Sequence, residues 1–208
     1  MLAMPSLGAR RVSWARVWAL CAALVAGAAA GWCGVASAAP ERTVTKTVVV
    51  NATLDQTWDA WTTREGITSF FAPDAKVEAR VGGPFQIYMD PDAAPGAKGA
   101  DDMRFMALQP KSMLSFDWNA PPRMPTVRAQ RTFVVVRLEA VSPQQTRVTL
   151  THTGWGEGGE WDKAYDYFDG SWSTVLDNLK RRFDTGPRDW TVWLQQLKVM
   201  RAAQAKKE

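Results

Sequence analysis

The chain has few residues of the types that usually bind metals or act as strong nucleophiles. Its 208 residues include one histidine, His152, and two cysteines, Cys21 and Cys33. Both cysteines lie in an apolar N-terminal run, so the rest of the chain has no thiol for a disulfide, a nucleophile or a metal ligand. Zinc sites are built mainly from several cysteines and histidines. We therefore expect no metal site and no cofactor.

The sequence also lacks a recognisable set of residues for covalent catalysis. No serine lies in a nucleophile-elbow motif, and no second histidine is present. The glycines between 154 and 159 precede a helical stretch, but a phosphate-binding lysine and a preceding dinucleotide pattern are missing. We assign no catalytic residue on this basis.

The excess of positive charge is confined to the N-terminal segment. The formal net charge is +4, and Arg10, Arg11 and Arg16 precede any acidic residue. Without residues 1–38 the chain has 22 basic residues against 21 acidic ones. A nearly neutral domain gives no support to nucleic acid as a partner.

The N-terminal 38 residues have the layout of a secretory signal peptide. A basic leader of 16 residues is followed by the apolar run 17–35 and then by Ala36-Ser37-Ala38. Small residues at that place are typical of a signal-peptidase site, which predicts a mature chain from about Ala39. We therefore expect a periplasmic or secreted protein. An uncleaved membrane anchor is the alternative, because the apolar run nearly reaches spanning length.

One long helix organises the remaining sequence. Apolar residues recur at steps of three and four between Trp161 and Phe183, which predicts a helix of roughly 34 Å with one apolar face. Two short helices are predicted at 54–61 and 64–71. Strands are predicted at 43–50, 76–80, 84–89, 103–108, 113–118, 126–141 and 146–153. Short connections between them indicate a curved antiparallel sheet of six or seven strands in an α+β fold.

Three stretches carry a resemblance to a known family. They are residues 48–73, 82–89 and 146–183, which hold a strand with two short helices, a glycine turn into a strand, and the last strand with the long helix. In this arrangement the chain resembles the START-like (SRPBCC) superfamily, and within it the branch named after the C-terminal domain of the activator of Hsp90 ATPase. The resemblance implies a helix-grip domain over residues 39–186, with a deep apolar cavity between sheet and helix. Because the Hsp90 activators are intracellular and carry a separate chaperone-binding domain, we do not expect Hsp90 as a partner.

The C-terminal stretch 187–208 is an addition to that pattern. Trp190, Trp193, Leu194 and Leu197 repeat at helical spacing ahead of a basic end, which predicts an additional amphipathic helix. Docking on the domain is the interpretation we favour. Peripheral membrane binding or self-association through residues 190–207 is the alternative.

Aromatic residues are concentrated where the sheet would close over the helices. The chain has eleven tryptophans, which favours a large aromatic core or a cavity. The candidates for lining a cavity are Trp58, Trp61, Phe70, Phe71, Phe85, Phe116, Trp118, His152, Tyr165, Phe168 and Trp172. The same helical stripe is typical of an ordinary core, and His152 is typical of a structural histidine with hydrogen-bond partners.

These features together favour an exported module that binds a hydrophobic small molecule or lipid in a central apolar cavity. One alternative is a cavity enzyme of cyclase or hydrolase type using His152 and Tyr165, with Asp169 directed into the same pocket. Another is a cell-envelope interaction module that acts through the C-terminal helix.

Overall fold

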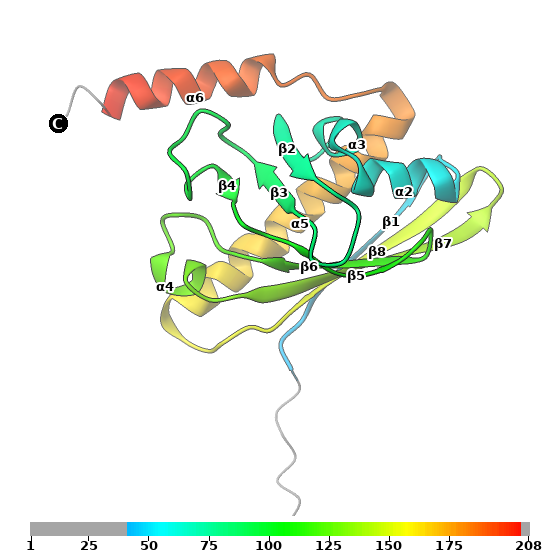
Figure 1. Ribbon diagram of the computed structural model, residues 1–208, viewed down its shortest axis with the longest axis horizontal. Coiled ribbons are helices and arrows are strands. Elements are labelled where there is room, and N and C mark those ends of the chain that lie inside the picture. Colours follow the sequence, from blue (N-terminus) through cyan, green and yellow to red (C-terminus); the bar gives the residue numbers. More distant parts are fainter. Residues whose placement is uncertain (1–40, 205–208) are drawn as a thin grey trace, which may run out of the picture. The chain divides into compact units, whose positions relative to one another are not determined.

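The computed structural model describes residues 41–204 (Figure 1). The expected signal peptide and the C-terminal lysines Lys206 and Lys207 lie outside the described residues. Within residues 41–204, none of the helices combines the length and the apolar character needed to cross a membrane.

The main sheet has five antiparallel strands in the order β1-β8-β7-β6-β5. They are β1 (Val44–Val50), β5 (Phe105–Gln109), β6 (Met113–Trp118), β7 (Thr132–Ser142) and β8 (Gln145–Thr153). Side chains alternate between buried and accessible along β7 and β8, as the sequence pattern predicts for a sheet with one covered face. The covered face packs against the long helix.

A smaller sheet of three strands completes the β structure. It consists of β2 (Asp74–Val77), β3 (Phe85–Tyr88) and β4 (Gly99–Ala100), again antiparallel. An isolated bridge between Pro84 and Arg104 connects this sheet to the start of β5. The eight strands therefore form two sheets, where six or seven strands in one sheet were predicted.

Within residues 41–204, five helices lie around these sheets. They are α2 (Leu54–Thr62), α3 (Arg64–Thr68), α4 (Pro125–Arg128), α5 (Gly159–Thr185) and α6 (Thr191–Gln204). Thr53 and Gln56 form a capping box that fixes the start of α2. Pro125 begins the short helix α4 inside the stretch that we predicted as a strand, since its fixed φ suits the first turn of a helix.

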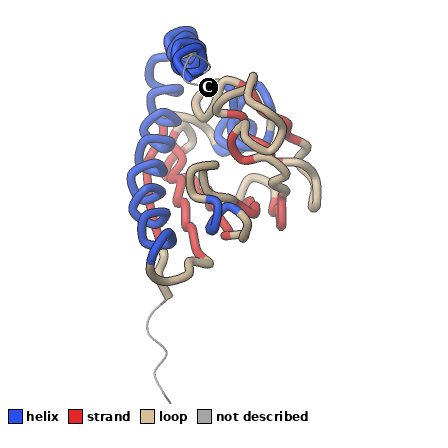
Figure 2. Tube along the Cα trace, turned by 90° about the vertical axis from the view of Figure 1, so that its left-hand side faces the viewer, coloured by secondary structure: helices blue, strands red, loops and turns tan. Residues whose placement is uncertain are grey.

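Helix α5 is the central element of the helix-grip arrangement (Figure 2). It lies along the main sheet and buries Ala164, Phe168, Trp172, Leu176 and Leu179 there. Its bounds extend the predicted helix by two residues at each end. The helix ends at Gly186, whose φ of 105° is a left-handed conformation that glycine adopts without strain.

Candidate ligand-binding pocket

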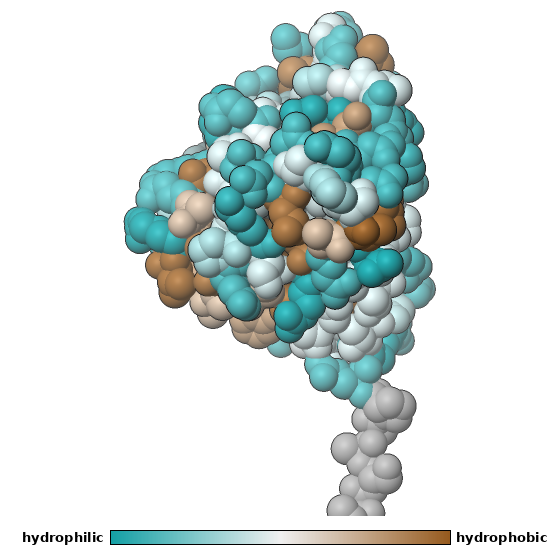
Figure 3. Space-filling view, turned by 90° about the vertical axis from the view of Figure 1, so that its right-hand side faces the viewer, coloured by the Kyte–Doolittle hydropathy of each residue, from teal (hydrophilic) through white to brown (hydrophobic). Residues whose placement is uncertain are grey.

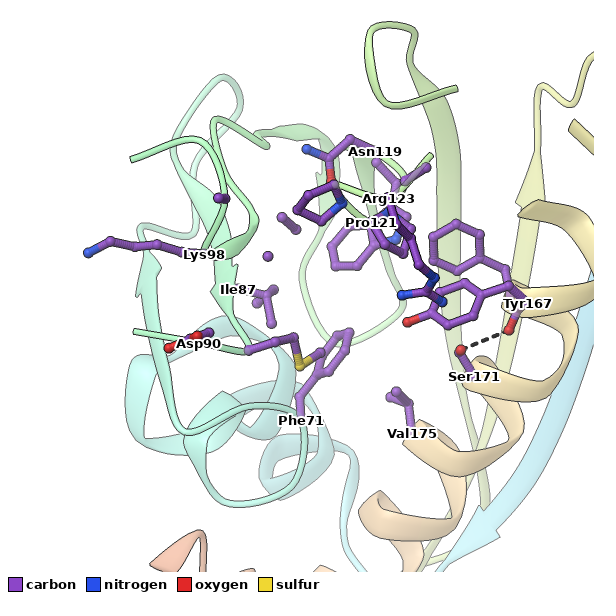
Figure 4. A pocket seen from close by; sticks show the side chains of 18 of the residues that line it. Phe71, Ile87, Asp90, Lys98, Asn119, Pro121, Arg123, Tyr167, Ser171 and Val175 are labelled. Carbon is purple, nitrogen blue, oxygen red and sulfur yellow. Dashed lines mark hydrogen bonds between the residues drawn. The ribbon is translucent and has the colours of Figure 1, made fainter. Parts of the chain in front are cut away.

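A pocket of about 300 Å³ opens between α5 and the smaller sheet (Figure 4). Its walls come from α5, from the chain segments 87–100 and 118–123, and from α6. The volume is at the lower end of the range of natural small-molecule sites, which begins at about 300 Å³.

Aromatic rings form the apolar part of the pocket. Phe71, Trp118 and Trp172 contact one another, with ring centroids 5.4 to 5.9 Å apart. All three are at least 95% buried and line the pocket. Rings at these distances and tilts stabilise one another beyond their burial, so this wall is held in place without a ligand.

A buried ion pair holds the two loop walls together. Arg128 and Asp101 are 3.1 Å apart, and their side chains are only 15% and 10% exposed. Asp101 also accepts hydrogen bonds from the backbone N–H groups of Gly96 and Gly99, each at 3.0 Å. Arg128 donates in addition to the carbonyl oxygens of Ala120 and Gly96. Arg128 and Asp101 thereby join the segment around Gly99 to the segment around Ala120.

Helix α6 supplies the outer wall. Trp193 and Leu197 line the pocket, and Trp193 Nε1 donates to the carbonyl oxygen of Met89 at 2.8 Å. Near the far end of the helix, Arg201 forms ion pairs with Asp90 and Asp92. The predicted additional helix is therefore present and is docked on the domain.

The polar end of the pocket lies between α5 and the proline-rich segment 119–125. The guanidinium carbon of Arg123 is 4.6 Å from the centroid of the Tyr167 ring. Figure 4 shows both side chains directed toward the same part of the cavity, with Asn119 beside Arg123. The hydroxyl of Ser171 donates to the carbonyl oxygen of Tyr167 at 2.8 Å.

His152 lies in the core behind the pocket wall and is fully buried. Trp172 Nε1 donates to His152 Nδ1 at 2.8 Å, and His152 Nε2 is 2.7 Å from the hydroxyl of Thr132. An indole N–H can only donate, so Nδ1 must accept and Nε2 carries the proton. Burial lowers the pKa of His152 from 6.5 to about 3, which keeps the ring neutral.

A family model decides the classification. The model described as Activator of Hsp90 ATPase homolog 1-like protein matches residues 51–184, more than half of the chain. The chain belongs to this family. The resemblance inferred from three stretches of sequence is thus confirmed. No curated protein matches the chain.

Solved structures of low identity share the fold of this Hsp90-activator-like domain. Protein MLL2253 from Mesorhizobium loti is 22% identical with a TM-score of 0.56, over 69% of this chain and 97% of its own. The Aha1 dimer from Colwellia psychrerythraea is 20% identical with a TM-score of 0.53, over 70% and 98%. CalU16 from Micromonospora echinospora is 19% identical with a TM-score of 0.52, over 75% and 83%. At these identities the likeness concerns the fold alone.

The eleven aromatic and histidine candidates occupy three kinds of position in the Hsp90-activator-like domain. Those that line the pocket are Phe71, Trp118, Phe168 and Trp172. Those buried in the core outside the pocket lining are Trp61, Phe70, Phe85, Phe116 and His152. Trp58 and Tyr165 are half-buried and pack against the core.

The residues of the alternative enzymatic hypothesis do not meet in the pocket. Tyr165 donates to the carbonyl oxygen of Thr43 at 3.2 Å and lies under the guanidinium of Arg42. Asp169 pairs with Lys46 at 2.8 Å. Neither residue lines the pocket, and His152 is separated from it by Trp172.

Several pocket residues were not among the candidates. Trp193 and Leu197 belong to a helix that we expected to dock on the domain but did not assign to the pocket, and their apolar spacing was the available signal. Arg123 and Tyr167 carried no such signal, because one lies in an irregular segment and the other on the mainly polar face of α5. Only the three-dimensional arrangement brings them together.

Proposed function

We propose that this domain binds a hydrophobic small molecule in the pocket between α5, the smaller sheet and α6, and that it does so as an exported protein. The observation that carries the binding proposal is the pocket of about 300 Å³ with its wall of fixed aromatic rings. Filling such a pocket removes apolar surface from water, which contributes about 25 cal/mol per Å² before the costs of association. A fatty chain or an aromatic ring system suits these walls.

Binding is favoured over catalysis by the roles that the polar groups already have. The hydroxyl of Ser171 is engaged by its own helix, and the single histidine is held neutral behind Trp172. Asp90 at the rim is paired with Arg201. No nucleophile and base face each other among the described residues that line the pocket.

The exposed apolar residues are scattered, which favours the pocket over the protein surface as the functional site. Val192 and Val199 on the outer side of α6 are 69% and 60% exposed, and Phe133 on β7 is 41% exposed. On the face of the domain drawn in Figure 3, hydrophobic atoms form separate patches bounded by hydrophilic ones. Scattered apolar residues of this kind are common on soluble proteins, whereas a protein interface needs a larger continuous patch.

A neutral dye tests the proposal. Nile red should bind the purified domain with a rise in its emission and a change in tryptophan fluorescence. Ser171→Phe places a ring in the pocket and should weaken Nile red binding about tenfold, a difference of about 1.4 kcal/mol.

Thr174→Phe is the matched control, because Thr174 is an exposed hydroxyl residue of the same helix and does not line the pocket. Its affinity for Nile red should equal that of the unsubstituted protein. Absence of Nile red binding by the folded domain, or equal effects of the two substitutions, would contradict the proposal.

A further inference from the structure

The pocket has an uneven distribution of charge. Only three of its lining residues are charged: Asp90, Lys98 and Arg123. Asp90 is neutralised by Arg201. Arg123 has no carboxylate within 4 Å among residues 41–204, so its positive charge at the pocket is not compensated by the described part of the protein.

The side chains of the two basic residues, Lys98 and Arg123, point in different directions. Figure 4 shows the side chain of Lys98 extending away from the cavity, with its ammonium 5.4 Å from the Tyr88 ring. Arg123 instead reaches toward the cavity over the Tyr167 ring. Stacking on an aromatic ring fixes the plane of a guanidinium and leaves its edge free to donate hydrogen bonds.

A second polar group lies at the same end of the pocket. Asn119 is 7% exposed, lines the pocket, and makes no side-chain hydrogen bond within residues 41–204. Its side-chain amide is not among the fully buried polar groups that lack a partner, so the amide remains accessible at this end of the pocket. Asn119 and Arg123 therefore provide unused donors next to an apolar cavity.

We infer that the ligand is an amphipathic carboxylate, with its apolar body against the aromatic wall and its carboxylate at Arg123 and Asn119. This inference rests on the proposed binding function and adds the chemical class of the ligand. A planar guanidinium matches a carboxylate with two parallel hydrogen bonds. One uncompensated positive charge suits a monoanion, whereas a phosphate dianion would need more donors than this end of the pocket offers.

The test compares ligands that differ only in the charged group. Decanoate and decanol compete with Nile red for the purified domain at neutral pH, and their dissociation constants are measured. Decanoate should bind about tenfold more tightly than decanol, as expected for a charge-assisted hydrogen bond. The difference should shrink in high salt, because Arg123 lies at the exposed mouth of the pocket.

Substitutions test whether the preference for decanoate over decanol comes from Arg123. Arg123→Gln should make the two ligands equal by weakening decanoate alone, and Arg123→Lys should retain a preference because the charge remains. Arg137→Gln is the matched control, since Arg137 is exposed on β7 and lies outside the pocket. It should leave both affinities unchanged.

The outcomes separate this inference from the proposed function. If Nile red binds but decanoate and decanol have equal affinities, the carboxylate inference is wrong and the binding function stands. If Arg137→Gln and Arg123→Gln lower decanoate affinity equally, the preference is a general effect of charge and the inference is also wrong. If Nile red, decanoate and decanol all fail to bind the folded domain, both are wrong.

Discussion

His152 is the residue that connects the sheet to the pocket wall. It accepts a hydrogen bond from Trp172 on α5 and contacts Thr132 on β7. A protonated imidazole has two N–H donors and no acceptor, so it would lose the bond from Trp172. The role of His152 is therefore to position a ring of the pocket wall, and this role needs the neutral form.

This leads to a prediction about stability and pH. The folded-state pKa of about 3 lies below the unfolded value of 6.5, so between these values the unfolded chain binds the additional proton. The free energy of unfolding should be at its full value above pH 6.5 and fall by up to about 1.4 kcal/mol per pH unit toward pH 3. Urea unfolding at about pH 7 and about pH 5 measures this change in the free energy of unfolding. We expect His152 to lower that free energy by about 2 kcal/mol at the lower pH.

His152→Gln is the control for the carboxylates that titrate over the same range. A glutamine oxygen can still accept from Trp172 but does not titrate. Its unfolding free energy should depend less on pH than that of the unsubstituted protein. Parallel curves for the two proteins would show that His152 is not responsible.

Helix α6 is the element that supplies the outer wall of the pocket. None of its described side chains is fully buried. Hydrogen bonds from Trp190 to Thr68 and from Trp193 to Met89 hold it, together with the ion pairs of Arg201. An element held by so few contacts opens at a lower free energy than the sheet does.

Trp193→Ala should therefore affect ligand binding more than stability. It removes both a ring of the outer wall and the bond to Met89, so Nile red affinity should fall about tenfold while unfolding free energy changes by less than about 2 kcal/mol. Val192→Ala removes an exposed side chain of the adjacent position and should change neither quantity. Equal affinities for the two variants would mean that α6 does not form a working wall.

Sequence patterns predicted best the elements that are long enough to repeat the helical or strand spacing several times. The stripe from Trp161 to Phe183 predicted α5 to within two residues at each end, because six turns repeat the same spacing. Helix α4 and strand β4 have four and two residues, too few for a period to appear. Strand β4 exists because Gly99 and Ala100 pair with β3, a partner that local sequence does not reveal.

The pocket itself was predictable only in part for a related physical reason. A stripe such as Phe168 and Trp172 identifies the face of a helix that is covered, but not whether the covering surface fills all the space. Whether the space is filled depends on the positions of the loops and of α6, and on long-range pairs such as Asp101 with Arg128. The charged end at Arg123 depends on the same long-range arrangement.

At the scale of the whole chain, the described pocket is built entirely from residues between Phe71 and Leu197. Residues 1–38 carry a different composition, with three arginines ahead of an apolar run and small residues at 36–38. Under the proposal of export, residues 1–38 act during export and the domain binds its ligand afterwards. The proposal of export can therefore be tested separately from that of binding.

The chain expressed in a bacterial host should yield an envelope form whose intact mass corresponds to a start at or near Ala39, because a signal peptidase accepts small residues before the cleaved bond. Ala38→Asp should prevent cleavage and leave the full-length chain in the membrane fraction. Protein produced without residues 1–38 should bind Nile red as tightly as the envelope form does. A full-length unsubstituted chain in the membrane would contradict cleavage, since an anchor would then be retained. Loss of Nile red binding on deletion would instead show that the pocket depends on residues beyond those that line it.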